Sequence, residues 1–223
     1  MKNKKLIIIG SGETANLAYE YFTYDSDYEV VAFAVNQEYL KEDTFLGLPV
    51  VAFECVENIY NPAEYEAFVA LSSGKLNRDR MKMYKQTKDK GYKLASYVSS
   101  KAFVWRNVEI GENCFILEDN TLQPFTKVGN NVVMWSGNHL GHQSIIKDNC
   151  FVTSHVVICG CSEIGENSFL GVNSSVADYK KVAKDNFIAM GAVITRNTKE
   201  NGVYVGNPAT KSEITALEFC GVE

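Results

Sequence analysis

A six-residue spacing of aliphatic side chains constrains the fold of this 223-residue chain more than any other feature. Every sixth position from Val98 to Ile194 carries an aliphatic residue or methionine, without insertion or gap. Such internal repetition is typical of solenoids, in which each coil contacts only its neighbours. Two positions before each aliphatic residue the side chain is usually small, as at Ser144 and Ser162, which lets a narrow triangular prism close around the aliphatic stack. The hexapeptide pattern predicts a left-handed parallel β-helix.

A second period, of eighteen residues, indicates that three hexapeptides make one coil. Asparagine or aspartate recurs at this period at Asn113, Asn131, Asn149, Asn167 and Asp185. These residue types tolerate left-handed backbone, so the column marks a corner of the prism. The same register stacks each residue on the one eighteen positions later, and it places His142 beside Gly160 in the next coil.

Residues 1–95 lack the repeat and alternate between strand and helix patterns. The apolar runs predict strands at 4–10, 29–35 and 65–71, and the spacing of apolar residues predicts helices at 11–22 and 76–90. This alternation favours a small Rossmann-like α/β domain with a parallel sheet. The expected organisation is therefore mixed, with an α/β domain over 1–95, the β-helix over 96–200, and a C-terminal loop and short helix over 201–223.

A glycine-rich turn joins the first expected strand to the first expected helix. Residues 10–15 read Gly-Ser-Gly-Glu-Thr-Ala and fit G-x-G-x-x-A, whose amides and helix N-terminus can receive a phosphate or ribose. A simple tight turn that needs small residues is the alternative. A nicotinamide site would place Asp or Glu after the second strand, where Val35 and Asn36 stand, so dinucleotide redox chemistry is not expected.

The charge, the apolar runs and the cysteines limit the binding partners and the cellular location that this chain is expected to have. A net charge of −5 provides no basic surface for nucleic acid or acidic membranes. The apolar run near residue 6 is too short for a signal sequence, and no later stretch reaches transmembrane length. The six cysteines form no C-x-x-C pair and are expected to be reduced thiols. We expect a cytoplasmic protein without a membrane or nucleic-acid partner.

All three histidines lie within the expected β-helix. His142 faces a glycine in the next coil, which suggests open volume and an accessible amide beside the imidazole. An acyl thioester could be received there, while the histidine takes a proton from an attacking amine or hydroxyl. His139 and His155 are interpreted individually as solvated or interface residues, although His139 stays a second candidate for the base. A zinc site made by the histidines is a rival, but no carboxylate stands beside them to orient a ligand, and no metal is expected.

Four segments resemble the hexapeptide-repeat sugar acyltransferases that carry an N-terminal sugar-nucleotide domain. They are IIIGSGETA, GHQSIIKDNCFVTSHVVICG, IGENSFLGVNSSV and YVGNPATK. This family is the sialic-acid O-acetyltransferase-like group, with the N-acetyltransferases of bacillosamine, perosamine and viosamine biosynthesis. The resemblance implies a homotrimer with active sites between neighbouring β-helices, acetyl-CoA in the groove between them, and the base at His142. The next position is usually acidic in the family; here it is Gln143, which removes a charge but can still form a hydrogen bond.

The resemblance also implies binding residues. Contacts to acetyl-CoA would fall at Phe151, Gly160, Val172, Met190, Gly191 and Pro208. Contacts to the sugar nucleotide would fall at Gly12, Glu13, Thr14, Val35, Asn36, Ser72, Ser73 and Lys75. Several relatives have His where Thr14 stands and Asp where Val35 stands, so the base or sugar recognised here is expected to differ from theirs.

The expected function is transfer of an acetyl group from acetyl-CoA to the amine of a nucleotide-linked amino deoxy sugar, a precursor of a surface polysaccharide or other glycan. O-acetylation of a sugar hydroxyl is the alternative; Gln143 favours the amine, because a hydroxyl needs a better-tuned base. A γ-carbonic-anhydrase-like metal enzyme and a non-catalytic β-helix scaffold are candidates from other classes. The stacking of His142 on Gly160 and the nucleotide-type domain argue against a scaffold.

Overall fold

The computed structural model describes residues 2–222, and the chain forms two compact units. The N-terminal unit consists of Met1–Ser72 and Arg80–Tyr97, and the β-helix unit consists of Ser73–Asp79 and Val98–Glu223. The short segment Ser73–Asp79 therefore belongs with the β-helix, although it lies within the range expected for the N-terminal domain.

The N-terminal unit contains the expected parallel sheet, with strand order β3-β4-β2-β1-β5, in which β3 is antiparallel to β4 and β1 is an interior strand between β2 and β5. The strands are β1 Lys4–Ile9, β2 Tyr28–Val35, β3 Thr44–Phe45, β4 Leu48–Ala52 and β5 Tyr65–Val69. The helices are α1 Glu13–Tyr24, α2 Val56–Ile59 and α3 Arg78–Asp89, with 3₁₀ turns η1 Gln37–Tyr39 and η2 Phe53–Cys55. The apolar end of β1, Leu6–Ile9, is fully buried between its neighbours, as a central parallel strand requires. The three predicted strands and two predicted helices are confirmed; the short elements between β2 and β5 were not anticipated.

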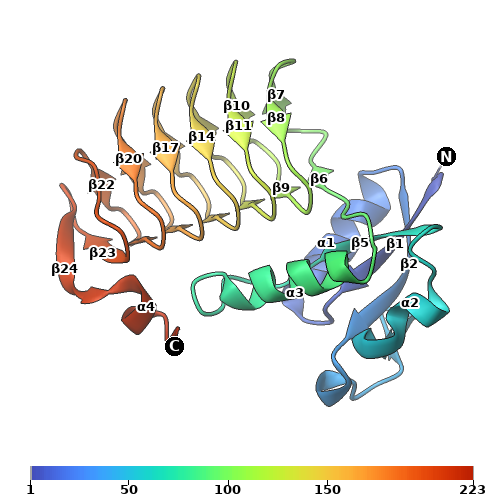
Figure 1. Cartoon of the computed structure of the whole chain (residues 1–223). Coiled ribbons are helices and arrows are strands. Elements are labelled where there is room, and N and C mark those ends of the chain that lie inside the picture. Colours follow the sequence, from blue (N-terminus) through green and yellow to red (C-terminus); the bar gives the residue numbers. More distant parts are fainter. Residues whose placement is uncertain (1, 223) are drawn as a thin grey trace. The chain divides into compact units, whose positions relative to one another are not determined.

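The β-helix unit has three flat faces of two-residue strands, and Figure 1 shows its coils stacked side by side from β6 to β22. The His139 face contains β7 Phe103–Val104, β10 Thr121–Leu122, β13 His139–Leu140, β16 Val157–Ile158, β19 Ser175–Val176 and β22 Val193–Ile194. The charged face contains β8 Glu109–Ile110, β11 Lys127–Val128, β14 Ile145–Ile146, β17 Glu163–Ile164 and β20 Lys181–Val182. The aromatic face contains β6 Tyr97–Val98, β9 Phe115–Ile116, β12 Val133–Met134, β15 Phe151–Val152, β18 Phe169–Leu170, β21 Phe187–Ile188, β23 Gly202–Val205 and β24 Thr210–Thr215. The predicted left-handed β-helix is confirmed, and β23 and β24 extend one face beyond the repeat.

The repeated aliphatic residues form the core of this prism. From Ile116 to Ile194 every one of them is almost completely buried in a single cluster. Ser144 and Ser162 of the small column are buried too, and their hydroxyls are satisfied: Ser144 Oγ donates to the carbonyl of Cys159 at 2.9 Å, and Ser162 Oγ donates to that of Ala177 at 2.9 Å. A larger side chain there would displace the aliphatic stack, since protein interiors leave little free volume.

The asparagine column forms a ladder along the corner between the charged and aromatic faces. Its residues have the expected left-handed backbone, with φ from 54° at Asn113 to 60° at Asn149. The side-chain amide of Asn113 donates to Asn131, and that of Asn131 donates to Asn149, each at 2.8 Å. Further along, Asn167 donates to Asp185 at 3.0 Å. The column thus joins successive coils by side-chain hydrogen bonds as well as turning the chain.

The segment Ser73–Asp79 packs on the β-helix unit through three successive residues. Leu76 is buried against Val203 and Ala216, next to the short helix α4 Ala216–Phe219. Asn77 is fully buried and its amide nitrogen donates to the carbonyl of Asn167 at 3.2 Å. Arg78 then forms an ion pair of 2.5 Å with Asp185, at the end of the asparagine ladder. This segment contributes to the β-helix unit even though it is distant in sequence.

Candidate active site

His142 lies on the corner between the His139 face and the charged face, which we call the His142 corner. Its imidazole is exposed, while its backbone is fixed at both polar groups. Its N–H donates to Oε1 of Gln123 at 2.9 Å, and its C=O accepts from the N–H of Cys161 at 2.9 Å. A rigid backbone that carries an exposed imidazole is what a general base requires.

Gly160 lies directly against the His142 ring, as the eighteen-residue register predicts. A Cβ at position 160 would stand 2.7 Å from both Cε1 and Nε2 of the imidazole. The expected open volume beside the ring is therefore occupied by the ring itself. Any larger side chain at position 160 would displace the imidazole, because the ring packs on the Gly160 backbone.

The other ring nitrogen of His142 points to a residue that the sequence analysis did not select. The Sγ atom of Cys161 lies 4.0 Å from Nδ1 of His142, and the same thiol donates to Oε1 of Gln143 at 3.5 Å. A signal for this contact was present, since Cys161 follows Gln143 by one coil length. In the side-chain hydrogen bond described for Gln143, its partner is the Cys161 thiol, which is not a charged group.

The other two histidines lie on different parts of the prism. His139 is half-buried on β13, where it pairs with Thr121 and Val157 in the expected register. His155 lies on the corner between the aromatic and His139 faces, the His155 corner, and packs on Gly137, where a Cβ would stand 2.5 Å from its Nδ1. Among residues 2–222, no three or more His, Cys, Asp or Glu side chains form a group that could hold a metal ion.

The residues implied for acetyl-CoA are spread over the β-helix unit. Val172 and Met190 occupy one column of the His155 corner, and Met190 is 73% exposed. Phe151 is buried on the aromatic face, where its ring stacks on Phe169. Pro208 is exposed in the loop between β23 and β24. Gly160 is the member of this set that the structure places against His142.

The glycine turn of the N-terminal unit lies at the carboxyl end of β1. Gly10 has φ of 123°, and a Cβ there would stand 2.9 Å from the carbonyl oxygen of Ala70, so only glycine fits. Gly12 is the N-cap of α1 and is exposed, as is Glu13. Because β2, β1 and β5 are parallel neighbours, the turn lies at the same sheet edge as Val35, Asn36 and Ser72. Thr14 is half-buried in the first turn of α1, and the last two implied residues, Ser73 and Lys75, belong to the β-helix unit.

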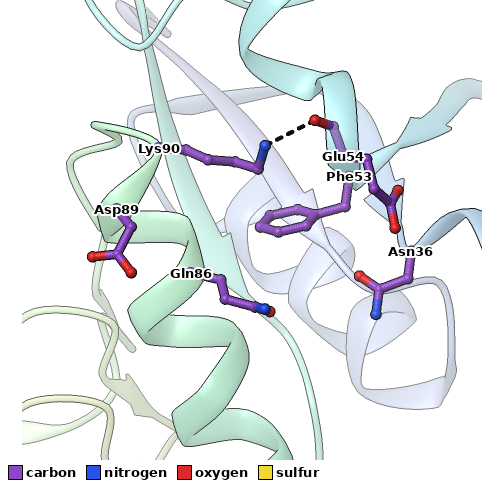
Figure 2. A pocket seen from close by; sticks show the side chains of 6 residues that line it. All are labelled: Asn36, Phe53, Glu54, Gln86, Asp89 and Lys90. Atoms are coloured by element: carbon purple, nitrogen blue, oxygen red, sulfur yellow. Dashed lines mark hydrogen bonds between the residues drawn. The ribbon is translucent and has the colours of Figure 1, made fainter.

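A pocket of about 370 Å³ adjoins this edge within the N-terminal unit. Figure 2 shows its lining: Asn36, Phe53, Glu54, Gln86, Asp89 and Lys90. The Lys90 ammonium lies 5.1 Å above the centre of the Phe53 ring and donates to the Glu54 carbonyl at 3.0 Å. Lys90 also forms an ion pair with Glu57, and its hydrogen bond to the Glu57 carboxylate holds the pKa of that carboxyl below its usual value. The pocket thus combines a fixed ammonium, which covers the buried Phe53 ring, with the amides of Asn36 and Gln86 and the carboxylates of Glu54 and Asp89.

Comparison with known proteins relates both units to acetyltransferases. A variant of perosamine N-acetyltransferase from Caulobacter crescentus, solved with CoA and GDP-perosamine, superposes with a TM-score of 0.83 at 21% identity, covering 93% of this chain and 96% of that one. The acetyltransferase domain of PglB from Neisseria gonorrhoeae, solved with acetyl coenzyme A, gives a TM-score of 0.84 at 21% identity, covering 94% of this chain and 100% of that one.

Curated relatives match a shorter region. The acyl-(acyl-carrier-protein)–UDP-N-acetylglucosamine O-acyltransferase of Sinorhizobium fredii is 27% identical over 115 residues, which is 48% of this chain and 43% of that protein. The UDP-3-O-acylglucosamine N-acyltransferase of Methylococcus capsulatus is 26% identical over 111 residues, which is 50% of this chain and 31% of that protein. The chain thus matches less than half the length of either relative, and no family model matches it. The chain nevertheless has the fold of the two solved acetyltransferases over nearly its whole length, and its resemblance to the hexapeptide-repeat sugar acyltransferases is confirmed.

Proposed function

We propose that this chain is an acetyl-CoA-dependent N-acetyltransferase that acts on a nucleotide-linked amino deoxy sugar, with His142 as the general base. The observation that carries the proposal is the exposed His142 imidazole, fixed over Gly160, in a fold shared over 93% of the chain with an enzyme solved with CoA and GDP-perosamine. The likeness includes the N-terminal unit, which a β-helix scaffold does not need.

The proposed reaction is a direct transfer. The sugar amine attacks the thioester carbonyl, so that a C–N bond forms and the C–S bond to CoA breaks. Nε2 of His142 takes the proton lost by the amine, and that proton then neutralises the departing CoA thiolate. General-base assistance of this kind contributes about 10²- to 10⁴-fold in rate.

For the acceptor, we propose that the sugar nucleotide binds at the carboxyl edge of the N-terminal sheet. The exposed N-terminus of α1, at Gly12, offers backbone amides to a phosphate. The pocket lined by Asn36 and Gln86 offers amide donors and acceptors of the kind that hydrogen-bond the edge of a nucleotide base. The side chains of Thr14 and Asn36 are the candidates for selecting among nucleotides.

We further propose a homotrimer, with acetyl-CoA between neighbouring subunits. Apolar side chains stand exposed on the His139 face and the His142 corner, among them Val157 at 39%, Phe125 at 63% and Tyr179 at 72%. The charged face carries ion pairs instead, as between Lys147 and Glu163. Apolar patches of this kind mark interaction surfaces, so the first two surfaces are the ones that partners would cover. Light scattering of the purified protein should give three chains per particle, and Phe125→Asp should reduce that number.

The decisive experiment measures CoA thiol release from acetyl-CoA with a panel of UDP-, dTDP- and GDP-linked amino sugars. The native chain should turn over at least one of them, and His142→Ala should abolish turnover without changing the melting temperature. His139→Ala should cost less activity; the reverse order would move the base to His139. Near-normal turnover in a folded His142→Ala variant would refute the assignment.

O-acetylation is a second candidate because one curated relative is named as an O-acyltransferase. The same panel, extended to the matching nucleotide sugars without an amine, separates the two. Turnover only of sugars that lack the amine would replace N-transfer with O-transfer.

We also propose a cytoplasmic location. None of the six cysteines, all of which lie within residues 2–222, is in a disulfide, and reducing compartments maintain this state. No helix among residues 2–222 is long and apolar enough to cross a membrane.

A further inference from the structure

The orientation of a catalytic imidazole depends on what holds its second nitrogen. A base that acts through Nε2 must carry its proton on Nδ1, and a hydrogen-bond acceptor beside Nδ1 selects that tautomer. Carboxylates commonly fill this place, but position 143, directly after the histidine, is Gln143. The acceptor in this chain therefore has to be found elsewhere.

The group that faces Nδ1 of His142 is the Cys161 thiol, with Sγ at 4.0 Å. The two residues are in adjacent coils, and the hydrogen bond from the Cys161 N–H to the His142 C=O, at 2.9 Å, fixes their register. The opposite edge of the ring, with Cε1 and Nε2, lies over Gly160. The exposed imidazole thus contacts Cys161 on its Nδ1 side and Gly160 along its Nε2 edge.

The thiol has a partner of its own, which determines the direction of both hydrogen bonds. Cys161 Sγ lies 3.5 Å from Oε1 of Gln143, an oxygen that can only accept. When S–H donates to this oxygen, the sulfur lone pairs remain for Nδ1–H. The alternative, S–H donating to Nδ1, would put the ring proton on Nε2 and remove the base.

Resting on the assignment of His142 as the base, we propose that Cys161 is the positioning residue of this site. Nδ1–H of His142 donates to Sγ of Cys161, and S–H of Cys161 donates to Oε1 of Gln143, which leaves Nε2 unprotonated for the sugar amine. Gln143 takes part by orienting the thiol rather than by contacting the imidazole. The chain thus uses a thiol–amide pair where a carboxylate is usual.

The same geometry argues against Cys161 as an acyl-carrying nucleophile. Its sulfur faces the nitrogen opposite to the one that acts as the base, so the thiol and Nε2 cannot serve the same reacting carbonyl. The neighbouring Cys159 is no better placed, because burial, and secondarily the charge of Asp178, raise the pKa of its thiol and keep it neutral. Direct transfer needs neither thiol to form a bond.

The first test reads the tautomer and needs no substrate. Nitrogen-15 NMR of the three histidines, with His142 assigned through His142→Ala, should show Nδ1 protonated and Nε2 bare in the native chain. Cys161→Ala should raise the Nε2–H fraction, and Cys161→Asp should restore the native pattern because a carboxylate is a stronger acceptor. Aspartate suits the backbone there, since Cys161 has a left-handed φ of 56°. Cys55→Ala, which removes a thiol from the N-terminal unit, is the matched control and should leave the spectrum unchanged.

The second test is kinetic. Loss of one neutral hydrogen bond corresponds to about a threefold to tenfold change in rate, so Cys161→Ala should lower kcat by that factor with KM for both substrates unchanged. Cys161→Asp should recover kcat. A merely structural role would lower the melting temperature, and the aspartate would not restore activity.

Three outcomes overturn the proposal. They are an Nε2–H tautomer in the native chain, an identical tautomer in Cys161→Ala, or an acetyl group found on Cys161 by intact-mass spectrometry after incubation with acetyl-CoA. Failure of the proposed function is a different result: no nucleotide sugar would be acetylated, while the NMR experiment would still report on Cys161.

Discussion

Substitution of Gly160 by alanine tests whether the packing of the His142 ring matters for catalysis. The added Cβ would stand 2.7 Å from Cε1 and Nε2, against 3.4–4 Å for an ordinary contact, so the ring must move. The backbone itself tolerates the change, because Gly160 is not among the glycines with positive φ. The imidazole is exposed and can swing outward, so the fold should remain intact. Misplacement of a catalytic group by roughly 1 Å costs about 10²-fold in rate, which corresponds to about 2.7 kcal/mol.

The assay is kcat/KM for acetyl transfer, measured beside the melting temperature. We expect Gly160→Ala to lose about 10²-fold in kcat/KM while it melts close to the native chain. Gly141→Ala is the matched control, because its Cβ would stand 2.6 Å from the backbone nitrogen of Gly160, which cannot move aside as a side chain can. That variant should lose thermal stability. Native kcat/KM in Gly160→Ala would refute the reasoning, and so would an equal loss of stability in both variants.

Three further predictions concern stability. Asn131→Ala should lower the free energy of unfolding, measured in urea, by about 1–3 kcal/mol, because the buried side-chain amide forms a hydrogen bond with an asparagine in each neighbouring coil. An unchanged urea midpoint would mean that the ladder is not stabilising. Arg78→Ala should lower the free energy of unfolding by a similar amount, about 1–3 kcal/mol, because Asp185 then loses an ion pair whose two side chains are only 22% and 15% exposed. A free energy of unfolding equal to that of the native chain would contradict this prediction. Lys147 holds the pKa of Glu163 below its usual 4.5 by a direct hydrogen bond, so this stabilisation is present above pH 4.5 and is lost as the pH falls through the lowered pKa. Glu163→Gln should therefore lower the free energy of unfolding at neutral pH by about 0.2–1 kcal/mol, the range for a surface pair, and this difference from the native chain should vanish in acid. A difference that stays constant with pH would refute the reasoning.

The parts of the fold that could be predicted are those fixed by uninterrupted periodicity. With no insertion between Val98 and Ile194, counting by eighteen places His142 on Gly160 as reliably as it places one asparagine on the next. The eighteen-residue register does not predict the rotamer of a side chain. The ring was therefore expected beside an open volume, whereas it fills that volume and turns its Nδ1 to Cys161.

The parts that could not be predicted depend on irregular backbone. The elements η1, β3, β4, η2 and α2 lie in a stretch without apolar periodicity. The docking of Leu76 and Asn77 rests on contacts with residues 90 or more positions away in the sequence. It also needs left-handed φ values of 48° at Leu76 and 65° at Asn77, which propensity does not favour for leucine. Such contacts leave no local pattern in a single sequence.

The docking of Ser73–Asp79 has a consequence for engineering chimeras. A gene fragment that begins at Val98 would encode the whole repeat, yet it would lack Leu76, the amide that bonds to Asn167, and the cation that neutralises Asp185. The β-helix unit of this chain is therefore discontinuous in its gene. A chimera that joins this β-helix to the N-terminal domain of another protein must include the segment Ser73–Asp79 along with the coils.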